Sequence, residues 1–422
     1  MIPARALLRR ALAGKDCDFR FRRLDALPAV DLPRAHIYIH VPFCQDKCPF
    51  CPYYKERYAP EAAVAFGEAL SAEIDLVAGR FGEIEVPSVY IGGGTPALLL
   101  DGLSQWLDRL RRRFRVTGSI AIELRPEDCH PGTLRRLRGD GVTQASVGVQ
   151  SFQPDVLRRI GRRSSPGLVE EALPRLVDAG FAGVNADMMF AIPGQTMAGL
   201  RDDVGRIAAS GVDQVTYYPL FTFSYAAAGD RARQGSVRMP PFRERYRQYR
   251  FIWDRFLTDG YEPASVWSFI KNGAPRFSSV TRDVYIGLGA GAASCMPGHF
   301  WFNPFDVRTY AEAVGRRNLP AQMHMPVPKR LTDLYWLYWR LYETFVPEDG
   351  VADRFGTRPI RLRAALRLGR LLGWIRRTHD GWRLTRSGSF WVHLAQNHLL
   401  LDSIDRYWRA AGAVPCPDEI DI

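Results

Sequence analysis

The chain has 422 residues, of which 46% are hydrophobic, and its formal net charge at pH 7 is +12. This size is ample for one large core with an appendage, whereas the seven unevenly spaced cysteines exclude a disulfide framework and favour a reducing compartment. Because there is neither an apolar run of about 18 residues nor the apolar segment of a signal peptide, we expect a cytoplasmic protein without a membrane partner.

The positive charge raises the question of nucleic-acid binding. The arginines, however, are spread along predicted helices, as at 109–115 and 361–377, and no RNA-binding aromatic motif accompanies them. We therefore interpret them as solvated helix faces and expect no nucleic-acid partner. An anionic substrate is compatible with this charge.

After an N-terminal arm over residues 1–34, apolar runs alternate with amphipathic stretches. The predicted strands are 36–41, 88–91, 119–124, 144–149, 182–190 and 213–220. The predicted helices are 61–79, 102–114, 131–138, 167–179 and 196–210. This alternation predicts an α/β fold in which a parallel sheet curls into a partial barrel over residues 35–235. The carboxyl ends of its strands should face the active site.

Three cysteines, Cys44, Cys48 and Cys51, follow the first predicted strand as a C-x3-C-x2-C triplet. Soft thiolates select zinc or iron–sulfur clusters. Structural zinc sites are normally closed by four protein ligands, and no second pair exists here, since the other cysteines are scattered. The triplet therefore predicts a 4Fe–4S cluster with one iron left open for a small molecule.

Glycines and charged residues stand at or after the ends of the next strands. The glycines at 92–94 allow a ligand to approach the backbone closely, although they are also compatible with a simple tight turn. Glu123 and Asp187 are carboxylates in apolar strands and need partners when buried, with a solvated strand end as the alternative for Glu123.

The cysteine spacing, with an aromatic residue before the last cysteine, resembles the radical S-adenosylmethionine (SAM) enzymes. The preceding Tyr38-Ile-His-Val-Pro-Phe-Cys44 is similar to the branch that contains the oxygen-independent coproporphyrinogen dehydrogenases. The resemblance implies a partial (β/α)6 TIM-like barrel, a 4Fe–4S cluster and reductive cleavage of SAM to a 5′-deoxyadenosyl radical. It also implies a barrel extension with second-site elements over residues 236–325 and a HemN-like winged-helix module over 326–422, lying as a lid on the barrel.

The resemblance also implies which residues hold the cofactors. Tyr38 is implied as a cofactor-binding residue, and those implied for the first SAM are Gly93, Gly94, Thr95, Glu123, Gln150, Arg162 and Asp187. Arg162, or Arg163 if the register slips by one residue, would pair with the SAM carboxylate through its forked guanidinium. Those implied for a second SAM are Phe50, Phe221 and Ala293, with Phe221 equally compatible with a core or substrate-wall aromatic. Ala191 stands where the family usually has glycine.

Three reactions are compatible with this family. Coproporphyrinogen decarboxylation is disfavoured because Tyr53 stands where that enzyme has a further cysteine. A haem-chaperone role is disfavoured because residues 279–285 lack the His-Asn-x-x-Tyr segment of those relatives. By elimination we expect a methylase, or a cyclopropane-forming relative, that uses two SAM molecules.

The expected substrate is a small molecule of aromatic, heterocyclic or tetrapyrrole type, modified at an sp2 carbon. The expected electron donor is a flavodoxin or a ferredoxin, and the expected state is a monomer.

Overall fold

The computed structural model describes residues 19–24, 29–223, 225–235, 237–278, 282–321, 323–356, 359–414 and 416–422. Much of the N-terminal arm and residues 279–281, on which the comparison with the His-Asn segment depends, lie outside the described residues.

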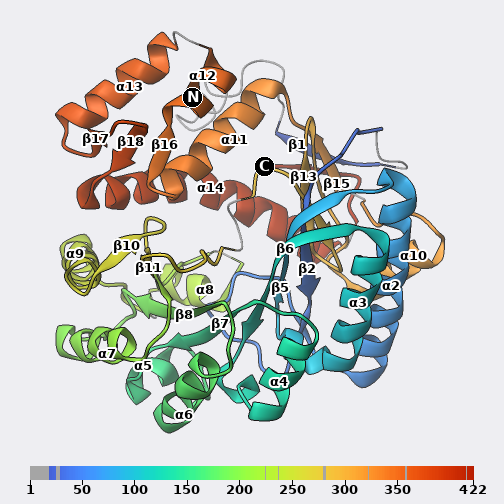
Figure 1. Cartoon of the computed structure of the whole chain (residues 1–422), viewed down its shortest axis with the longest axis horizontal. Helices are drawn as coiled ribbons and strands as arrows, with labels where there is room; N and C mark the ends of the chain where they lie inside the picture. Colours follow the sequence, from blue (N-terminus) through green and yellow to red (C-terminus); the bar gives the residue numbers. More distant parts are fainter. Residues whose placement is uncertain are drawn as a thin grey trace.

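The centre of the molecule is a parallel sheet that confirms the predicted partial barrel (Figure 1). Its strands are, in spatial order, β2 (His36–Val41), β5 (Glu85–Gly93), β6 (Arg115–Leu124), β7 (Gln144–Gln150), β8 (Gly183–Phe190) and β9 (Gln214–Pro219). The helices that follow these strands are α2 (Pro60–Phe81), α3 (Leu100–Arg113), α4 (Pro131–Gly139), α5 (Pro154–Arg159), α6 (Pro166–Val177) and α7 (Met197–Ala209). The sequence did not predict α5, which is only six residues long.

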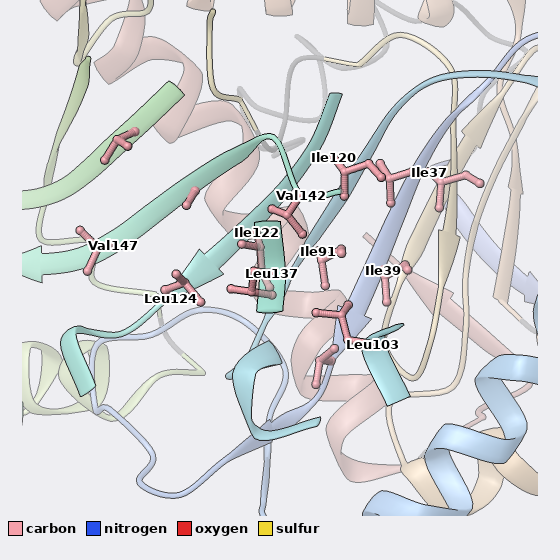
Figure 2. Packing of buried hydrophobic residues seen from close by; sticks show 14 of the residues in the cluster. Ile37, Ile39, Ile91, Leu103, Ile120, Ile122, Leu124, Leu137, Val142 and Val147 are labelled. Carbon is pink, nitrogen blue, oxygen red and sulfur yellow. The ribbon is translucent and has the colours of Figure 1, made fainter. Parts of the chain in front are cut away.

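Alternating apolar residues of the strands form the core between sheet and helices. Ile37 and Ile39 of β2 lie beside Ile91 of β5, and Ile122 of β6 completes the row (Figure 2). Leu103 of α3 packs against the same cluster. Because successive side chains of a strand point to opposite faces, the residues between these apolar ones face the inside of the barrel.

Short strands extend the sheet at both edges. Beside β9 lie β11 (Ser268–Lys271) and β10 (Tyr261–Pro263). Beside β2 lie β12 (Tyr285–Leu288), β13 (Ala293–Met296), β14 (His299–Phe302), β15 (Met323–Pro326), β1 (Arg20–Arg23) and β19 (Glu419–Asp421). The two described ends of the chain therefore share the barrel sheet, although the sequence analysis assigned them to an arm and to the C-terminal module.

The C-terminal part has the element order of a winged helix. It contains α11 (Lys329–Tyr342), β16 (Phe345–Pro347), α12 (Glu348–Phe355), α13 (Ile360–Leu371), β17 (Ile375–Arg377), β18 (Gly381–Leu384) and α14 (Arg386–Ala413). Its three strands form a separate antiparallel sheet in the order β16-β18-β17. The module lies above the barrel in Figure 1, in orange and red, and Val266 of the barrel extension donates a backbone hydrogen bond to Tyr342 of α11.

The remaining elements are α8 (Ala227–Arg233), α9 (Phe242–Thr258), α10 (Val307–Gly315) and the two-residue strands β3 (Phe43–Cys44) and β4 (Glu56–Arg57). In the part of the chain that the structure describes, every helix is too short or too polar to cross a bilayer.

Candidate functional site

A cavity of about 420 Å³ opens between the carboxyl ends of the barrel strands and the C-terminal module. The cysteine loop and the ends of β5 to β9 line one part of it, and α11 contributes aromatic side chains to another. This volume lies within the usual range for small-molecule sites.

The cysteine loop leaves the barrel at the end of β2 and is closed by pairing of β3 with β4. The Cys51 amide donates to the Cys48 carbonyl oxygen over 3.2 Å, which folds the loop back on itself. All three thiols line the cavity and are partly exposed. Burial raises the pKa of Cys44 and Cys48, so metal binding has to displace their protons.

The triplet suits a cluster better than a single ion. No group of three or more histidine, cysteine or acidic side chains among the described residues is arranged to chelate one metal ion. In an iron–sulfur cluster each cysteine binds its own iron, so the thiols need to face one volume and not one point. Three cavity-facing thiols on one loop meet that requirement.

The glycine segment packs directly on the cysteine strand. A Cβ atom at Gly94 would lie 2.4 Å from the Phe43 carbonyl oxygen, and one at Gly93 would lie 2.8 Å from the His40 ring. Gly93 also has a positive φ of 106°, which glycine adopts without strain. The glycines are therefore required for close backbone packing, and they also leave room in the cavity beside the thiols.

Two inward-facing carboxyl groups lie beside this segment. Glu123 accepts hydrogen bonds from the Tyr90 hydroxyl and from the Gly93 amide. Asp187 accepts from Ser146 Oγ over 2.8 Å and from Asn185 Nδ2 over 3.0 Å. Burial is the main cause that raises the pKa of Glu123 to about 7 and that of Asp187 to about 6. Neither carboxyl group forms an ion pair within the described residues, so both are suited to a cationic or hydroxyl-bearing ligand.

Arg162 supplies the positive charge of the site. Its Nη2 donates to the Gly148 carbonyl oxygen over 3.0 Å, whereas its buried Nε has no hydrogen-bond partner in the described structure. Arg163, the alternative by register, has an 82% exposed side chain and pairs with Asp46 at 3.3 Å. The unsatisfied donor makes Arg162 the better candidate for an anionic ligand group.

Gln150 is held in an unusual conformation at the end of β7. Its φ of 71° is positive and coincides with a register irregularity between β7 and β8. The Tyr218 hydroxyl donates to Gln150 Oε1 over 2.6 Å. Strained backbone of this kind clusters at functional sites.

Ala191 stands at the position where the family usually has glycine. Its φ of 57° is positive, which explains why glycine suits that position.

The structure gathers most of the predicted site residues. The cavity is lined by Cys44, Cys48, Phe50, Cys51, Gly93, Gly94, Thr95, Glu123, Gln150, Arg162, Asp187 and Phe221. Tyr38 is not part of this lining, since its hydroxyl bonds to the His40 ring and it packs beside Tyr90. Ala293 is also outside the lining, because β13 pairs it with Phe302 in the edge sheet.

Several lining residues were missed by sequence reasoning. Asn185 and Thr216 form a hydrogen-bonded row with Ser268 along the inside of β8, β9 and β11. The period-two alternation of these strands was the signal that would have found them. Arg276 lies in an irregular segment, and nothing in the local pattern marks it as part of the site.

The raised pKa values make stability depend on pH. Unfolded carboxyl groups lose their protons at about pH 4, whereas Glu123 and Asp187 keep theirs in the fold to about pH 7 and 6. Their contribution to stability is therefore present at low pH and is lost as the pH rises through these values. We expect the free energy of unfolding of the ligand-free protein to fall by about 1–2 kcal/mol between pH 5 and 8, allowing for water in the cavity.

Urea unfolding at several pH values measures this dependence. The Glu123→Gln variant should show a flatter pH profile than the parent, because its side chain does not titrate. Identical slopes in the two proteins would contradict the assignment.

Comparison with known proteins gives a consistent picture. Residues 38–207 match the profile of the Radical SAM superfamily. The chain is 30% identical over 291 residues to the haem chaperone HemW of Lactococcus lactis, covering 65% of this chain and 73% of that protein. It is 28% identical over 324 residues to the oxygen-independent coproporphyrinogen III oxidase of Bradyrhizobium diazoefficiens, covering 71% and 70% of the two chains.

The fold is similar to a solved structure of the same group. Coproporphyrinogen III oxidase (HemN) from Escherichia coli superposes with a TM-score of 0.73 at 20% identity, covering 89% of this chain and 91% of that one.

Proposed function

Since this chain belongs to the HemN-like family of the radical SAM superfamily, we propose that it is an enzyme that cleaves SAM reductively and acts on a tetrapyrrole. The observation that carries the proposal is one cavity that joins three thiols, a set of charges complementary to SAM and an aromatic wall from a second module. A flavodoxin or a ferredoxin is the proposed electron donor.

Cys44, Cys48 and Cys51 would hold a 4Fe–4S cluster through three of its irons. When bound, such a cluster supplies the electron that cleaves SAM to methionine and a 5′-deoxyadenosyl radical. The role of the chain is to position the reactants and to exclude water from them. The closed loop around the thiols and the module above the cavity serve that role.

The charged side chains of the cavity match the groups of SAM. SAM carries an ammonium, a carboxylate and a ribose with two hydroxyls. Arg162 has the unsatisfied donor for the carboxylate, and Glu123 and Asp187 are acceptors for the ammonium and the hydroxyls. The empty volume beside Gly93 and Gly94 leaves their backbone within reach of the ligand.

Aromatic rings face the same cavity from the other side. The helix α11 contributes Tyr338, Trp339 and Tyr342 to this lining. Trp267 and Phe221 also line the cavity, and their two rings pack edge to face at 5.6 Å. Planar unsaturated ligands are bound well by such rings. This wall, together with relatives named for haem and coproporphyrinogen, supports a tetrapyrrole as the substrate.

The methylase expectation has less support. The reported relatives are a haem chaperone and coproporphyrinogen oxidases, and Ala293, one of three residues assigned to a second SAM, does not line the cavity. We therefore propose tetrapyrrole chemistry with one SAM in place of methylation with two. A haem carrier is the second candidate, since a relative bears that name, but no histidine is among the described lining residues.

The anaerobically reconstituted protein, supplied with dithionite and SAM, tests the proposal. We expect slow formation of 5′-deoxyadenosine and acceleration by coproporphyrinogen III or by haem, measured by liquid chromatography. Tight stoichiometric binding of haem without any acceleration would support the carrier. Transfer of deuterium from a labelled SAM methyl group into deoxyadenosine would instead support a methylase that uses two SAM molecules.

A further inference from the structure

An arginine-bearing segment closes the cavity at the end away from the cysteines. Arg276, Phe277 and Ser278 line the cavity between β11 and β12. Buried glutamines at the first positions of β7 and β9, Gln144 and Gln214, hold this segment. β7 runs from Gln144, beside this segment, to Gln150, beside the proposed cofactor, and its seven residues rise by roughly 20 Å.

The backbone around Arg276 is fixed by four hydrogen bonds. Gln144 Nε2 donates to the carbonyl oxygens of Pro275 and Arg276 over 3.1 and 3.3 Å. Gln214 donates to the Phe277 carbonyl oxygen over 2.9 Å and accepts from the Phe277 amide over 3.0 Å. Arg276 therefore starts from a rigid position, which lowers the entropy lost when it binds a ligand.

Positive charge exceeds negative charge at this end. Arg276 and Arg340 share Glu343, at 2.9 and 3.0 Å, and Arg340 also pairs with Asp283 at 3.7 Å. Arg282 donates to Ser88 Oγ over 3.2 Å, and no described carboxylate forms an ion pair with it. Burial lowers the pKa of Arg276 and of Arg282, and Arg276 lowers that of Arg282 further by repulsion. A group that brings negative charge would relieve this repulsion and the cost of burying the guanidinium groups.

The neighbouring surface is suited to an unsaturated ring system. Tyr338 and Tyr342 of α11 and Trp267 of the extension line the cavity together with Arg276. The ring of Trp267 packs edge to face on that of Tyr342 at 5.2 Å. An aromatic wall with a forked cation at its end is complementary to a flat ligand that carries a carboxylate.

We propose that Arg276 binds an ionised carboxylate of the substrate and so orients its unsaturated ring system toward the cofactor end of the cavity, with Arg282 adding positive charge from outside the cavity lining. The inference rests on the proposed function and deepens it, because it names a carboxylate-bearing tetrapyrrole as the ligand class. It also predicts that esterified tetrapyrroles are discriminated against.

Titration of the reconstituted full chain with protoporphyrin IX and with its dimethyl ester, followed by fluorescence, tests the assignment. The parent should bind the free acid at least about tenfold more tightly than the ester, since hydrogen bonds between charged groups are the strong ones. Arg276→Gln should lose about tenfold in affinity for the acid and little for the ester.

Two further variants make the result interpretable. Arg308→Gln removes an 88% exposed arginine that pairs with Glu312 on α10, and it should bind the acid as the parent does. Glu343→Gln frees Arg276 and Arg340 from their shared carboxylate, so it should bind the acid several-fold more tightly. A merely structural role of Glu343 would instead weaken binding. If Arg276→Gln does not fold, Arg276→Lys replaces it, and loss of the forked guanidinium should weaken binding of the acid several-fold and that of the ester little.

The proposal would be overturned if the parent bound the acid and the ester equally or bound neither. It would also be overturned if Arg276→Gln lowered the affinity for both ligands equally. Deoxyadenosine formation by the parent is measured in the same preparation. Cleavage of SAM without acid selectivity refutes the carboxylate site and leaves the proposed function standing. Acid selectivity that depends on Arg276, without SAM cleavage, supports the site and refutes the enzyme.

Discussion

Replacement of Cys44, Cys48 and Cys51 together by alanine is expected to abolish the brown colour and the bound iron and sulfide of the anaerobically reconstituted protein. All three thiols lie on one loop and face one cavity, and no fourth cysteine among the described residues lines it. The loop itself should stay folded, because β3–β4 pairing and the backbone hydrogen bonds close it independently of the thiols. Iron and sulfide analysis together with circular dichroism measures both outcomes.

Cys129 provides the matched control. It is buried, its thiol donates to the Arg125 carbonyl oxygen over 3.5 Å, and burial raises its pKa to about 12. Cys129→Ala should therefore keep the full iron content and lose only a little stability. Retention of iron and sulfide in the triple variant would refute the cluster assignment.

The barrel was predictable because its strands bury one face regularly. Ile37, Ile39 and Val41 alternate in β2, and Val89 and Ile91 repeat the pattern in β5. This alternation of buried apolar residues is a strong signal for a strand, so the six parallel strands are those expected from the sequence. The helices between them followed from apolar residues at helical spacing and differ from the prediction by at most two residues at either end.

The edges of the sheet were not predictable by the same means. β1 and β19 have four and three residues, too few for any periodicity, and they meet only in the fold. Their pairing is stabilised by contacts such as the 3.0 Å ion pair between Arg20 and Glu419, which lie at opposite ends of the chain. No local pattern encodes such a contact.

Site residues that belong to regular strands were predicted correctly, whereas residues assigned from a motif alone were not all placed in the cavity. Glu123 and Asp187 belong to strands, whose alternation places them on the inner face together with Tyr90. For Tyr38 and Ala293 the motif gave the position in the chain but not the surroundings of the side chain.

Substitution of Arg162 by alanine is expected to weaken SAM binding to the reconstituted protein by roughly 10- to 100-fold, which corresponds to about 1–3 kcal/mol for a hydrogen bond to a charged group. Without SAM the variant should be about as stable as the parent, since it loses the hydrogen bond to the Gly148 carbonyl oxygen but no longer buries the unsatisfied Nε. Stabilisation by added SAM, measured as a shift in the thermal unfolding midpoint, should therefore be much smaller in the variant.

Arg163 is the control that the chain itself offers, because it is the same residue type one position further on. It lines the cavity together with Asp46, but its side chain is 82% exposed and pairs with Asp46, and a charge so exposed to water contributes little. Arg163→Ala should thus change SAM affinity by less than about threefold. The two variants carry the same net charge, so a general electrostatic effect would change SAM binding equally in both. Only a direct contact between Arg162 and the ligand predicts a large difference between these neighbours, and anaerobic equilibrium dialysis of the pair measures it.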